Sequence, residues 1–476
     1  MIKLNNLTNL VTGIEEHHQK IKEGYVFFAI PGIKTNGESY INLAIQNGAK
    51  FIILDEKSKT SCDYKSVKFI RVSNPKKYLS QMLSQYYSHK PKNIVAVTGT
   101  NGKTSVVNFF QQICSLLGYQ SASIGTLGVV TSKGNNQYIR KRYFTSPMPI
   151  ELHKILQTLY NNSYTHIALE ASSHGIYQHR LDNINFNAVG FTNFSHDHLD
   201  YHITLKAYLN AKLRIFDKLL KENKYAIINA DIKEFELINQ ICQKRNIKVL
   251  SYGQKAKDLK IKSSIGNIWE IEIFNKKYFV NVKIDGVFQF YNILCSVGLA
   301  IACNLPIDKT LKILGNLKPV KGRLELVECY KGAKIYIDYA HTPDALKTVL
   351  QTLREQCNGK LHVLFGCGGQ RDQSKRVLMG NIASNYADCV IITDDNPRKE
   401  EKSDIRNQIL RSCSIGKEIE GRSNAIKYSI KKLKQNDILV IAGKGHENYQ
   451  IIGNKTIYFS DLQEIRKHTS YNKFDK

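Results

Sequence analysis

The sequence predicts an α/β protein of three domains: a small α/β domain and two larger domains with mostly parallel sheets. Three observations predict this fold class. A buried strand, a glycine-rich loop and an apolar helix follow one another near residue 100. Four more strand patterns alternate with helical patterns between residues 335 and 442, and polar joints separate these regions. With 476 residues, of which 42% are hydrophobic, the chain can bury the cores of about two to four domains.

The first predicted domain covers residues 1–92. Residues 24–32 have the pattern of a strand closed by a turn, residues 40–48 that of a helix, and residues 51–54 that of a second strand. The domain ends at residues 89–93, a polar stretch that contains a proline, as joints between domains commonly do.

The second predicted domain, residues 93–319, begins with a phosphate-binding loop. An apolar strand over Ile94–Val97 leads into the loop, and a helix over residues 106–117 follows, with Gly118 as its C-cap. Glycines let backbone N–H groups approach phosphate oxygens, and the helix N-terminus adds partial positive charge. The predicted nucleotide-binding residues of the loop are Gly99, Thr100, Asn101, Gly102, Lys103, Thr104 and Ser105.

Two side chains of this loop predict its ligands. Lys103 can reach the β- and γ-phosphates of a nucleotide, and the Thr104 hydroxyl can coordinate Mg²⁺. We therefore expect ATP and Mg²⁺ as cofactors. The loop has two residues between its glycines and not the four of the common P-loop, so the alternative is a turn that happens to contain Gly-Lys-Thr.

Three later strands of this domain each end in polar residues, and they span residues 166–170, 188–192 and 225–229. Parallel strands deliver such side chains to a site at their carboxyl ends. Glu170 and His198 both follow apolar strands and are candidate Mg²⁺ ligands, although an isolated histidine can equally be a hydrogen-bonded core residue. Residues 248–284 alternate more strongly and are expected to be antiparallel.

The third predicted domain, residues 320–476, repeats the pattern of strands followed by polar motifs. Its strands lie at residues 335–338, 362–365, 390–393 and 438–442. Helical patterns between them predict a Rossmann-like sheet, and polar motifs at the ends of its strands favour a binding site there over core packing.

Composition narrows the choice of partners and compartment. The chain carries 68 Lys and Arg against 41 Asp and Glu, a net charge of +27. The lysines are dispersed, so we expect an anionic small substrate and no nucleic-acid partner. Ten cysteines without a Cys-x-x-Cys pair indicate reduced thiols in a cytoplasmic protein. Residues 1–6 have no apolar signal core, and polar residues interrupt the apolar window 287–305, which predicts a buried helix and no membrane partner.

Four motifs of the central and C-terminal regions match one known family. They are Gly99–Thr104, Glu170–Gly175, Asp197–His202 and Asp338–Pro343. With these motifs the sequence resembles the Mur ligase family, the ATP-dependent amide ligases of peptidoglycan precursor synthesis, over nearly the whole chain. Gly366–Asp372 and Gly443–Glu447 resemble the branch that forms the UDP-MurNAc-tripeptide. Asp395–Arg398 resembles the signature of the members that add meso-diaminopimelate.

The resemblance implies a fold, a reaction and partners. The fold would comprise an N-terminal UDP-MurNAc-binding domain, a central ATPase domain and a C-terminal Rossmann-like domain that binds the amino acid. ATP would phosphorylate the D-glutamate carboxylate of UDP-MurNAc-L-Ala-D-Glu, and the amine of meso-diaminopimelate would then displace phosphate. We expect a cytoplasmic monomer whose partners are these small molecules.

The resemblance also implies the site residues. Lys103, His198 and Lys212 would be catalytic, and Lys212 would be carbamylated to N6-carboxylysine. Additional ATP-binding residues would be Asn292, Arg323 and Asp338. The metal ligands would be Thr104, Glu170, His198 and Lys212. The UDP-MurNAc-dipeptide would contact Lys34, Thr35, Thr145, Ser146, Ser172, Gln178 and Arg180. Meso-diaminopimelate would contact Arg371, Asp395, Asn396, Pro397, Arg398, Gly443 and Glu447.

Physical chemistry supports two of these roles and leaves one unexplained. A guanidinium can hold a carboxylate bidentately, so Arg398, with Arg371 nearby, suits the distal carboxylate that meso-diaminopimelate has and lysine lacks. Glu447 can bind an ammonium of the same amino acid. Without the resemblance, Lys212 would be interpreted as a solvent-facing helix residue.

Several positions depart from the family pattern. They are His17, His18 and Gln19 in place of Asp-Ser-Arg, Phe144 and Gln289 in place of asparagines, and Gln370 in place of an aspartate. Because most of them fall at the nucleotide-sugar end of the substrate, we expect relaxed or rebuilt uridine binding, with lost activity as the alternative.

Two other functions were considered. One is a related ligase that adds lysine, or glutamate to folate, against which Arg398 argues. The other is a basic P-loop protein that binds nucleic acid, which would need basic and aromatic residues gathered on one face.

Overall fold

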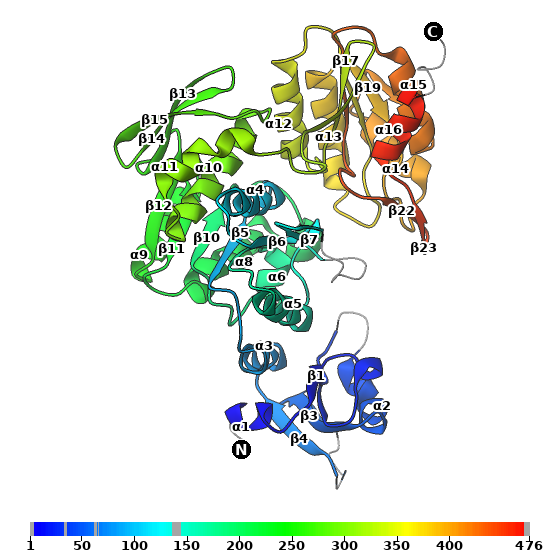
Figure 1. Ribbon diagram of the computed structural model, residues 1–476. Coiled ribbons are helices and arrows are strands. Elements are labelled where there is room, and N and C mark those ends of the chain that lie inside the picture. The colour runs from blue at the N-terminus through cyan, green and yellow to red at the C-terminus, as the bar shows by residue number, and fades with distance from the viewer. Residues whose placement is uncertain (1–3, 33–35, 61–63, 65, 136–143, 471–476) are drawn as a thin grey trace.

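The chain folds into three units that follow one another in sequence, in a computed structural model that describes residues 4–32, 36–60, 64, 66–135 and 144–470 (Figure 1). Within these residues the units contain sheets of four, eleven and six strands, and a two-stranded hairpin completes the last unit. The predicted α/β fold class and three-domain architecture are confirmed. The domain boundaries after residues 92 and 319 stay a prediction.

The N-terminal unit is a parallel sheet with helices on both faces. Its strands are β1 (Gly13–Glu15), β2 (Tyr25–Phe28), β3 (Ala49–Asp55) and β4 (Lys68–Val72). Its helices are α1 (Leu4–Thr8), α2 (Ile41–Gln46), α3 (Pro75–Tyr86) and the 3₁₀ turns η1 (His18–Lys20) and η2 (Gly37–Tyr40). Helix α3 begins where Asn74 caps it, with the side chain accepting from the Lys77 N–H, and where Pro75 supplies a preset backbone angle.

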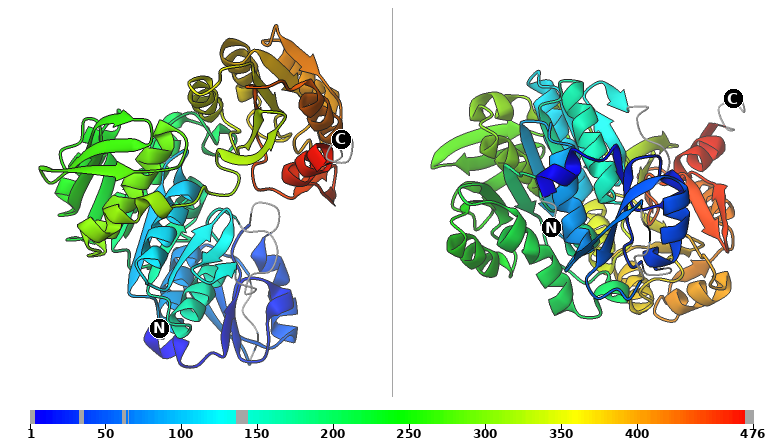
Figure 2. Two further views of the ribbon diagram at one scale, coloured as in Figure 1. Left: turned by 45° about the horizontal axis from the view of Figure 1, so that its top comes forward. Right: turned by 90° about the horizontal axis from the view of Figure 1, so that it is seen from below.

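Helix α3 also joins the N-terminal unit to the central unit. The Ser80 hydroxyl donates to the Asp182 carbonyl at 2.6 Å, and the Ser84 hydroxyl donates to the Asn183 carbonyl at 3.1 Å. Figure 2 shows the N-terminal unit beside the lower part of the central unit in a second orientation. The chain then runs directly from α3 into strand β5 (Asn93–Thr98).

The central sheet is built around β5 in the order β15-β14-β13-β12-β11-β10-β5-β9-β6-β7-β8. The further strands are β6 (Ser121–Gly125), β7 (Gly128–Thr131), β8 (Gly134–Asn135), β9 (His166–Glu170), β10 (Ala188–Phe191), β11 (Tyr225–Asn229), β12 (Lys248–Gly253), β13 (Leu259–Ile265), β14 (Ile268–Ile273) and β15 (Lys276–Asn281). Strands β13, β14 and β15 are antiparallel, as expected, but β12 pairs in parallel with β11 and β13. The prediction was wrong for β12 because residue alternation does not reveal the direction of the neighbouring strand.

Helices cover both faces of the central sheet. The set comprises α4 (Lys103–Leu116), α5 (Pro149–Asn161), α6 (Ser173–Tyr177), α7 (Leu199–His202), α8 (Leu205–Arg214), α9 (Phe235–Lys244), α10 (Val287–Ala302), α11 (Ile307–Lys312), the π-helical turn Ile215–Leu219 and η4 (Leu314–Asn316). Helices α4 and α10 pack together on one face, and α5, α8 and α9 pack on the other. The buried helix predicted in the apolar window is confirmed as α10. Among the described helices, none combines the length and apolarity needed to cross a bilayer.

The C-terminal unit is the predicted Rossmann-like sheet. Its strands are β16 (Glu325–Tyr330), β17 (Ala333–Ile337), β18 (Leu361–Phe365), β19 (Cys389–Ile392), β20 (Gly416–Glu418) and β21 (Ile438–Ile441), and the hairpin is β22 (Tyr449–Ile452) with β23 (Lys455–Tyr458). All sheet pairings are parallel except that of β16. Helices α12 (Pro343–Arg354), α13 (Ser374–Tyr386) and α14 (Lys402–Leu410) pack on one face, and α15 (Arg422–Lys432) and α16 (Asp461–Ser470) on the other.

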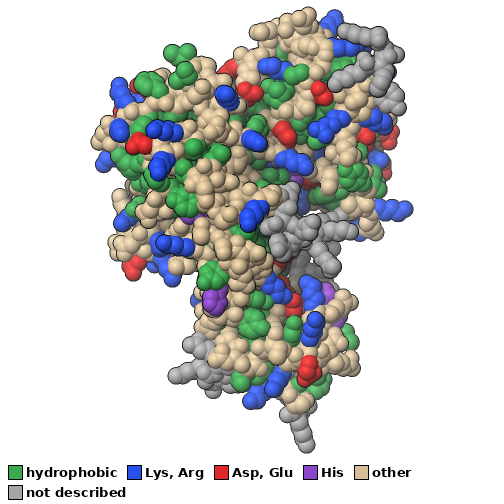
Figure 3. Space-filling view, viewed as in Figure 1, with side chains coloured by type: hydrophobic (Ala, Val, Ile, Leu, Met, Phe, Trp, Pro, Cys, Tyr) green, Lys and Arg blue, Asp and Glu red, His purple; other side chains and the backbone are tan. Residues whose placement is uncertain are grey.

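The register of the central sheet places three strand ends side by side. Val97 of β5 lies opposite Glu170 of β9, and Thr98 lies opposite Phe191 of β10. The phosphate loop, Glu170 and the segment after β10 therefore emerge at one edge of the sheet, where parallel α/β sheets bind ligands. On the face shown in Figure 3, lysine and arginine side chains are scattered among other residue types.

Candidate active site

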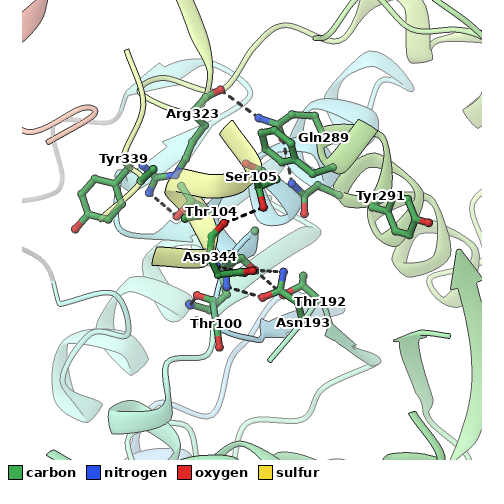
Figure 4. A pocket seen from close by; sticks show the side chains of 18 of the residues that line it. Thr100, Thr104, Ser105, Thr192, Asn193, Gln289, Tyr291, Arg323, Tyr339 and Asp344 are labelled. Atoms are coloured by element: carbon green, nitrogen blue, oxygen red, sulfur yellow. Dashed lines mark hydrogen bonds between the residues drawn. The ribbon is translucent and has the colours of Figure 1, made fainter. Parts of the chain in front are cut away.

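A cavity of about 700 Å³ lies between the central and C-terminal units, at this edge of the central sheet. Figure 4 shows part of its lining. Nine of the ten predicted ATP-binding residues line it, namely Thr100, Asn101, Gly102, Lys103, Thr104, Ser105, Asn292, Arg323 and Asp338. The tenth, Gly99, contributes a backbone carbonyl that accepts from two lysines of the lining.

The phosphate loop requires both of its glycines. Gly99 has a φ of 139° and Gly102 a φ of 86°, angles that side chains of L-residues rarely adopt. A Cβ on Gly99 would lie 2.0 Å from the Thr192 hydroxyl, and one on Gly102 would lie 2.4 Å from Asn292 Oδ1. The loop is therefore packed tightly against α10 and the end of β10, and any side chain at Gly99 or Gly102 would clash with them.

Neighbouring side chains fix the loop further. The Asn101 N–H donates to Asn193 Oδ1 at 2.8 Å, and the Thr192 hydroxyl donates to the Asn101 carbonyl at 2.6 Å. The Asn101 amide donates to Asp344 Oδ2 of helix α12 at 3.3 Å. The loop is thus anchored to its own sheet and to the C-terminal unit.

Lys103 and Lys212 meet at one backbone carbonyl. Lys103 Nζ donates to the Gly99 carbonyl at 2.9 Å and to the Thr100 carbonyl at 2.8 Å, and Lys212 Nζ donates to Gly99 at 2.7 Å. Burial lowers the pKa of Lys103, with Glu170 and Asp197 opposing that shift. Burial also takes the pKa of Lys212 well below its ordinary range, and the charge of Lys103 lowers it further.

The interpretation of Lys212 as solvent-facing from its sequence spacing alone is wrong. The side chain is 1% exposed, and its Nζ lies 4.4 Å from the ring centre of Tyr208. Helix α8 turns this face toward the phosphate loop, and the loop carbonyl satisfies the amine there. The helical pattern does not show this, because a carbonyl more than a hundred residues away in sequence supplies the partner.

Glu170 is a buried carboxylate held by one residue. Thr126 donates to it from its backbone N–H at 2.7 Å and from its hydroxyl at 3.0 Å. Burial raises the pKa of Glu170, while the charge of Lys103 and the bonds from Thr126 oppose that shift. A Cβ on Gly125 would lie 2.1 Å from Glu170 Oε1, so the carboxylate occupies the space that this glycine leaves.

His198 has a left-handed backbone and pairs with its neighbour. Its φ is 55°, and its Nε2 lies 3.3 Å from Asp197 Oδ2. Burial lowers the pKa of His198, although Asp197 opposes the shift. Burial alone would raise the pKa of Asp197, but His198, His341 and Lys375 lower it overall. A neutral imidazole beside an ionised carboxylate is the state in which His198 can act as a ligand.

The structure brings the four predicted metal ligands into the lining of this one cavity. They are Thr104, Glu170, His198 and Lys212. Two of them offer oxygen atoms, which Mg²⁺ prefers, and Glu170 is a desolvated carboxylate whose ionised form a cation would favour. Within the described residues, no group of three or more His, Cys, Asp and Glu side chains is placed to hold a metal ion unaided.

Arg323 links the C-terminal unit to the phosphate loop. Its Nη2 donates to the Thr104 hydroxyl at 3.0 Å, and its guanidinium carbon lies 4.3 Å from the ring centre of Tyr339 (Figure 4). Gln289 donates to the Arg323 carbonyl at 3.1 Å, which gives this departure from the family pattern a structural role. Asp338 accepts from the Leu324 and Ala340 N–H groups at 2.6 Å each, so it shapes the backbone beside the cavity.

Comparison with known proteins now decides the family. Three family models match along the chain: "Mur ligase family, catalytic domain" over residues 11–87, "Mur ligase middle domain" over residues 97–300, and "Mur ligase, glutamate ligase domain" over residues 322–445. The UDP-N-acetylmuramoyl-L-alanyl-D-glutamate–2,6-diaminopimelate ligase of Rickettsia typhi is 42% identical over 466 residues, 96% of this chain and 93% of that protein. The ligase of the same name from Mesorhizobium japonicum is 41% identical and covers 96% of this chain and 94% of its own.

The chain belongs to the Mur ligase family. A solved structure of a ligase with the same name has a TM-score of 0.67 and 29% identity, and covers 97% of this chain and 95% of that one. The MurF ligase of Thermotoga maritima, solved with ADP, has a TM-score of 0.63 and 18% identity over 99% of both chains. The folylpolyglutamate synthase of Mycobacterium tuberculosis has a TM-score of 0.64 and 14% identity over 82% of this chain and 93% of that one, a likeness of fold alone.

Within this Mur ligase, the residues predicted for the nucleotide-sugar dipeptide continue from the cavity. Thr145 and Ser172 line the cavity, and the Ser146 hydroxyl lies 3.0 Å from that of Ser172. Gln178 accepts from Arg180 Nε at 3.1 Å and from Nη2 at 2.7 Å. The structure thus brings five of the seven predicted residues into one region. Lys34 and Thr35 lie outside the described residues.

The residues predicted for meso-diaminopimelate form a group in the C-terminal unit of the Mur ligase. Asn396 Nδ2 donates to Glu447 Oε2 at 3.0 Å, and Arg398 Nη1 donates to the Gly369 carbonyl at 2.8 Å. A Cβ on Gly368 would lie 2.8 Å from Arg398 Nη1 and 3.8 Å from Arg371 Cγ, so both arginines flank this glycine. The remaining members are Asp395, Pro397 and Gly443, and a Cβ on Gly443 would lie 2.9 Å from Asp395 Oδ2.

This arginine group also touches the central unit. Arg371 Nη1 lies 3.5 Å from Asp200 Oδ2, and His196 Nε2 lies 2.9 Å from Asp372 Oδ2. Burial lowers the pKa of Arg398, and the charge of Arg371 lowers it further. Two guanidinium groups this close together form a site that attracts an anion.

Three of the departures lie together in the N-terminal unit. The ring of His18 stacks on that of Tyr40, with ring centres 4.5 Å apart and planes 4° apart, and His17 stacks on His18 at 5.3 Å. Gln19 follows in the same exposed turn. Gln370 lies elsewhere, in the Gly368–Gly369 loop, with a left-handed φ of 53°.

Sequence reasoning missed several residues that build the site. They are Thr126, Asn193, Asp197, Asp344 and Lys444. Lys444 is fully buried and donates to Glu447 Oε2 at 3.0 Å and to the Tyr449 carbonyl at 2.6 Å. Asp197 and Lys444 lie inside the motifs Asp197–His202 and Gly443–Glu447, so the available signal was a charged residue within a polar motif that follows a strand. Thr126 and Asn193 carry no such signal.

Proposed function

We propose that this Mur ligase adds meso-2,6-diaminopimelate to UDP-MurNAc-L-Ala-D-Glu in an ATP-dependent reaction that forms ADP and phosphate. The observation that carries the proposal is the pair Arg371 and Arg398 beside Gly368, in the unit that also contributes Arg323 and Asp338 to the phosphate-loop cavity. Relatives that are 41–42% identical over 96% of this chain bear the name of this activity. The C-terminal arginines therefore supply the anion site that this amino acid needs.

The first step is phosphoryl transfer. An oxygen of the D-glutamate carboxylate attacks the γ-phosphorus of ATP, the bond to the β,γ-bridging oxygen breaks, and an acyl phosphate and ADP result. Lys103 stands within the loop that holds the phosphates and offsets their charge as it shifts to the leaving oxygen. In the described state its ammonium is held by two carbonyls of the loop, so it is positioned before the nucleotide arrives.

Mg²⁺ fits the polar groups beside this loop. Thr104 and Glu170 would hold it through oxygen atoms, together with His198 and the modified Lys212. When bound, the ion supplies positive charge that neutralises the phosphate oxygens. Arg323 donates to the Thr104 hydroxyl in the described state, and that oxygen has a second lone pair for the ion.

Lys212 suits carbamylation because its amine is buried and favours the neutral form. A neutral amine adds to CO₂, forming an N–C bond and releasing one proton, and the product is an anionic carbamate. The pKa shift of Lys212, caused by burial and by Lys103, favours the reactive state. The anionic carbamate on Lys212 would attract the ammonium of Lys103.

The second step joins the amino acid. The free amine of meso-diaminopimelate attacks the acyl carbon, the carbon–oxygen bond to phosphate breaks, and an amide forms as the amine gives up a proton. Arg398 and Arg371 would hold the distal carboxylate, and Glu447, itself bonded to Lys444 and Asn396, would hold an ammonium. Orientation of the amine by these contacts is the contribution of the C-terminal unit.

The uridine end of the substrate would be bound in a rebuilt site. His17, His18 and Gln19 occupy the positions where the family pattern has Asp-Ser-Arg, and the ring of His18, which stacks on that of Tyr40, stands at the position of the serine hydroxyl. We expect a monomer in the cytoplasm that needs neither nucleic acid nor a membrane.

Phosphate release tests the proposal directly. The protein is incubated with ATP, Mg²⁺ and UDP-MurNAc-L-Ala-D-Glu, and with meso-diaminopimelate, lysine or no amino acid. We expect release that depends on the dipeptide and is fastest with meso-diaminopimelate. Preference for lysine would overturn the amino-acid assignment, and the absence of release with any combination would overturn the ligase assignment.

A further inference from the structure

An exposed aromatic ring covers a buried cation in the central unit. Phe144 is 60% exposed, yet its ring centre lies 4.7 Å from the guanidinium carbon of Arg180, which is only 7% exposed. Arginine within about 6 Å of an aromatic face is attracted by the ring quadrupole. An exposed phenylalanine is stabilised little by burial in a core. The contact with Arg180 is therefore the interaction that can hold the Phe144 ring in place.

The remaining contacts hold the guanidinium in one plane. Arg180 Nε and Nη2 donate to Gln178 Oε1, and Nη1 donates to the Ser146 carbonyl at 2.9 Å. Ser146 and Phe144 belong to the same short segment, so this segment holds Arg180 by a carbonyl at its edge and by a ring over its face. A guanidinium has five N–H donors, and the contacts among the described residues use three of them.

The electrostatic surroundings favour an anionic ligand. Burial lowers the pKa of Arg180, and Glu16 of the N-terminal unit opposes that shift. Burial likewise raises the pKa of Glu16. Both charged groups are therefore partly removed from water. The planar fork of Arg180 is therefore partly desolvated, and its unused N–H groups can donate to a carboxylate or phosphate oxygen, which a desolvated guanidinium binds more strongly.

We infer that Phe144 is a positioning residue that fixes and desolvates Arg180 for an anionic group of the nucleotide-sugar dipeptide, an inference that rests on the function proposed above. Phe144 replaces the asparagine of the family pattern, so at this position the chain has a ring that lies over the guanidinium of Arg180. Phe144 acts through Arg180 and does not touch the reacting atoms.

Steady-state kinetics of Phe144→Leu and Phe144→Tyr test the inference. Leucine keeps an apolar side chain and removes the ring quadrupole, whereas tyrosine keeps the ring. We expect Phe144→Leu to raise the KM for UDP-MurNAc-L-Ala-D-Glu about three- to tenfold, with kcat and the KM for ATP nearly unchanged. Phe144→Tyr should stay near the wild-type values. A purely structural role would lower kcat or the melting temperature in both variants.

A control and a double-mutant cycle complete the test. Phe279→Leu alters a more exposed phenylalanine on β15, 72% exposed against 60% for Phe144, and should leave every parameter unchanged. In Arg180→Met the cation and its planar fork are both lost, so adding Phe144→Leu should cause little further rise in KM. Equal effects of Phe144→Leu in the presence and absence of Arg180 would overturn the inference, and so would a fall in KM, which would make Phe144 an obstruction.

The two proposals fail in different ways. If wild-type protein releases no phosphate with the dipeptide, the proposed function fails. If the wild type is active and Phe144→Leu matches it, the function stands and the role of Phe144 is refuted.

Discussion

Lys103 and Lys212 donate to the same backbone oxygen, the carbonyl of Gly99, at 2.9 Å and 2.7 Å. Two ammonium groups this close in a buried site repel one another, because the local dielectric is far below that of water. The pKa of Lys212 is lowered by burial and then by Lys103, so the conflict is resolved by the neutral amine of Lys212. This arrangement leaves a nucleophilic amine beside the phosphate loop.

Carbamylation of Lys212 is the first prediction. Lys212→Ala should lose activity by at least about a hundredfold, the effect of removing one preorganised electrostatic group, and formate or another short carboxylic acid should restore part of it. Wild-type protein in ¹³C-bicarbonate should show a carbamate resonance that Lys212→Ala lacks. Lys206→Ala changes an exposed lysine on the same helix α8 and is the matched control. A fully active protein without the resonance, or density for a bare ammonium beside bound Mg²⁺, would contradict the prediction.

The second prediction concerns Lys103. Lys103→Ala should abolish turnover without unfolding the protein, because the lost cation raises the barrier to phosphoryl transfer by on the order of 3 kcal/mol or more. The measurement is phosphate release alongside the melting temperature. Lys244→Ala, at an exposed position of α9, should behave as wild type. Release close to wild type by a folded Lys103→Ala protein would refute the role.

A buried histidine predicts acid sensitivity of the fold. His153 of α5 is fully buried, and both of its ring nitrogens are without a hydrogen-bond partner among the described residues. Burial, reinforced by Lys90, lowers the pKa of His153 from 6.5 to about 3. Between these values the unfolded chain binds the proton and the folded chain does not, so stability is lost as the pH falls from 6.5 toward 3.

The third prediction is that protonation of His153 makes the fold less stable in acid. At pH 5, His153 should cost the folded state on the order of 2 kcal/mol relative to neutral pH. His153→Leu removes the titrating group, so its melting temperature should fall less between pH 7.5 and pH 5 than that of wild type. His89→Leu, at an exposed position, should retain the wild-type pH dependence. Parallel melting curves for wild type and His153→Leu at both pH values would exclude the effect.

The local sequence pattern predicted the phosphate loop, because the strand, the glycines and the helix follow one another directly in the sequence. It also predicted α10 and the Rossmann-like unit. It missed what long-range packing decides. The buried Lys212 donates a hydrogen bond to the Gly99 carbonyl, 113 positions away in sequence. Asn101 donates one to Asp344, 243 positions away. Neither partner can be inferred from helical periodicity. The resemblance to the family predicted a catalytic role for Lys212, but it predicted no role for Asp344.

Backbone strain was equally hidden from the sequence. Gln370 and Arg398 both have left-handed backbones with φ of 53°, an uncommon state for residues other than glycine. Gln370 was recognised only as a departure from the family pattern. The structure shows that its N–H donates to Glu400, whose other carboxylate oxygen accepts from Arg376 Nη2 at 2.8 Å. Glu400 therefore ties together the two loops that carry Arg371 and Arg398.

The fourth prediction tests Glu400 as a positioning residue. Glu400→Ala releases both loops, and the strain of about 1–3 kcal/mol in each left-handed residue can then relax. We expect kcat/KM for meso-diaminopimelate to fall about ten- to a hundredfold, with the KM for ATP unchanged. Glu400→Gln keeps an acceptor for the Gln370 N–H and should fall less. Glu401→Ala, at the exposed neighbouring position, is the control, and an equal loss of ATP binding in Glu400→Ala would show a general defect instead.

The last prediction concerns the choice of amino acid. Arg398 should discriminate meso-diaminopimelate from lysine by pairing with the distal carboxylate, which lysine lacks. Truncating one partner of a buried charge-assisted pair typically costs about 2–5 kcal/mol, or roughly 30- to several-thousand-fold in selectivity. Arg398→Ala should therefore reduce kcat/KM for meso-diaminopimelate by that factor and leave the KM for ATP nearly unchanged. Use of lysine, already poor, should change little.

The decisive comparison is kcat/KM for both amino acids on wild type and Arg398→Ala, with Lys399→Ala as the control at the adjacent exposed position. Arg398 Nη1 already donates to the Gly369 carbonyl, so a purely structural role is the competing explanation. It predicts that both amino acids lose the same factor, because a displaced loop would misplace any substrate. If Arg398 binds the distal carboxylate, kcat/KM should fall for meso-diaminopimelate and not for lysine. A wild-type preference for lysine would refute the amino-acid assignment, and the ligase assignment would survive it, because the phosphate-loop cavity does not depend on Arg398.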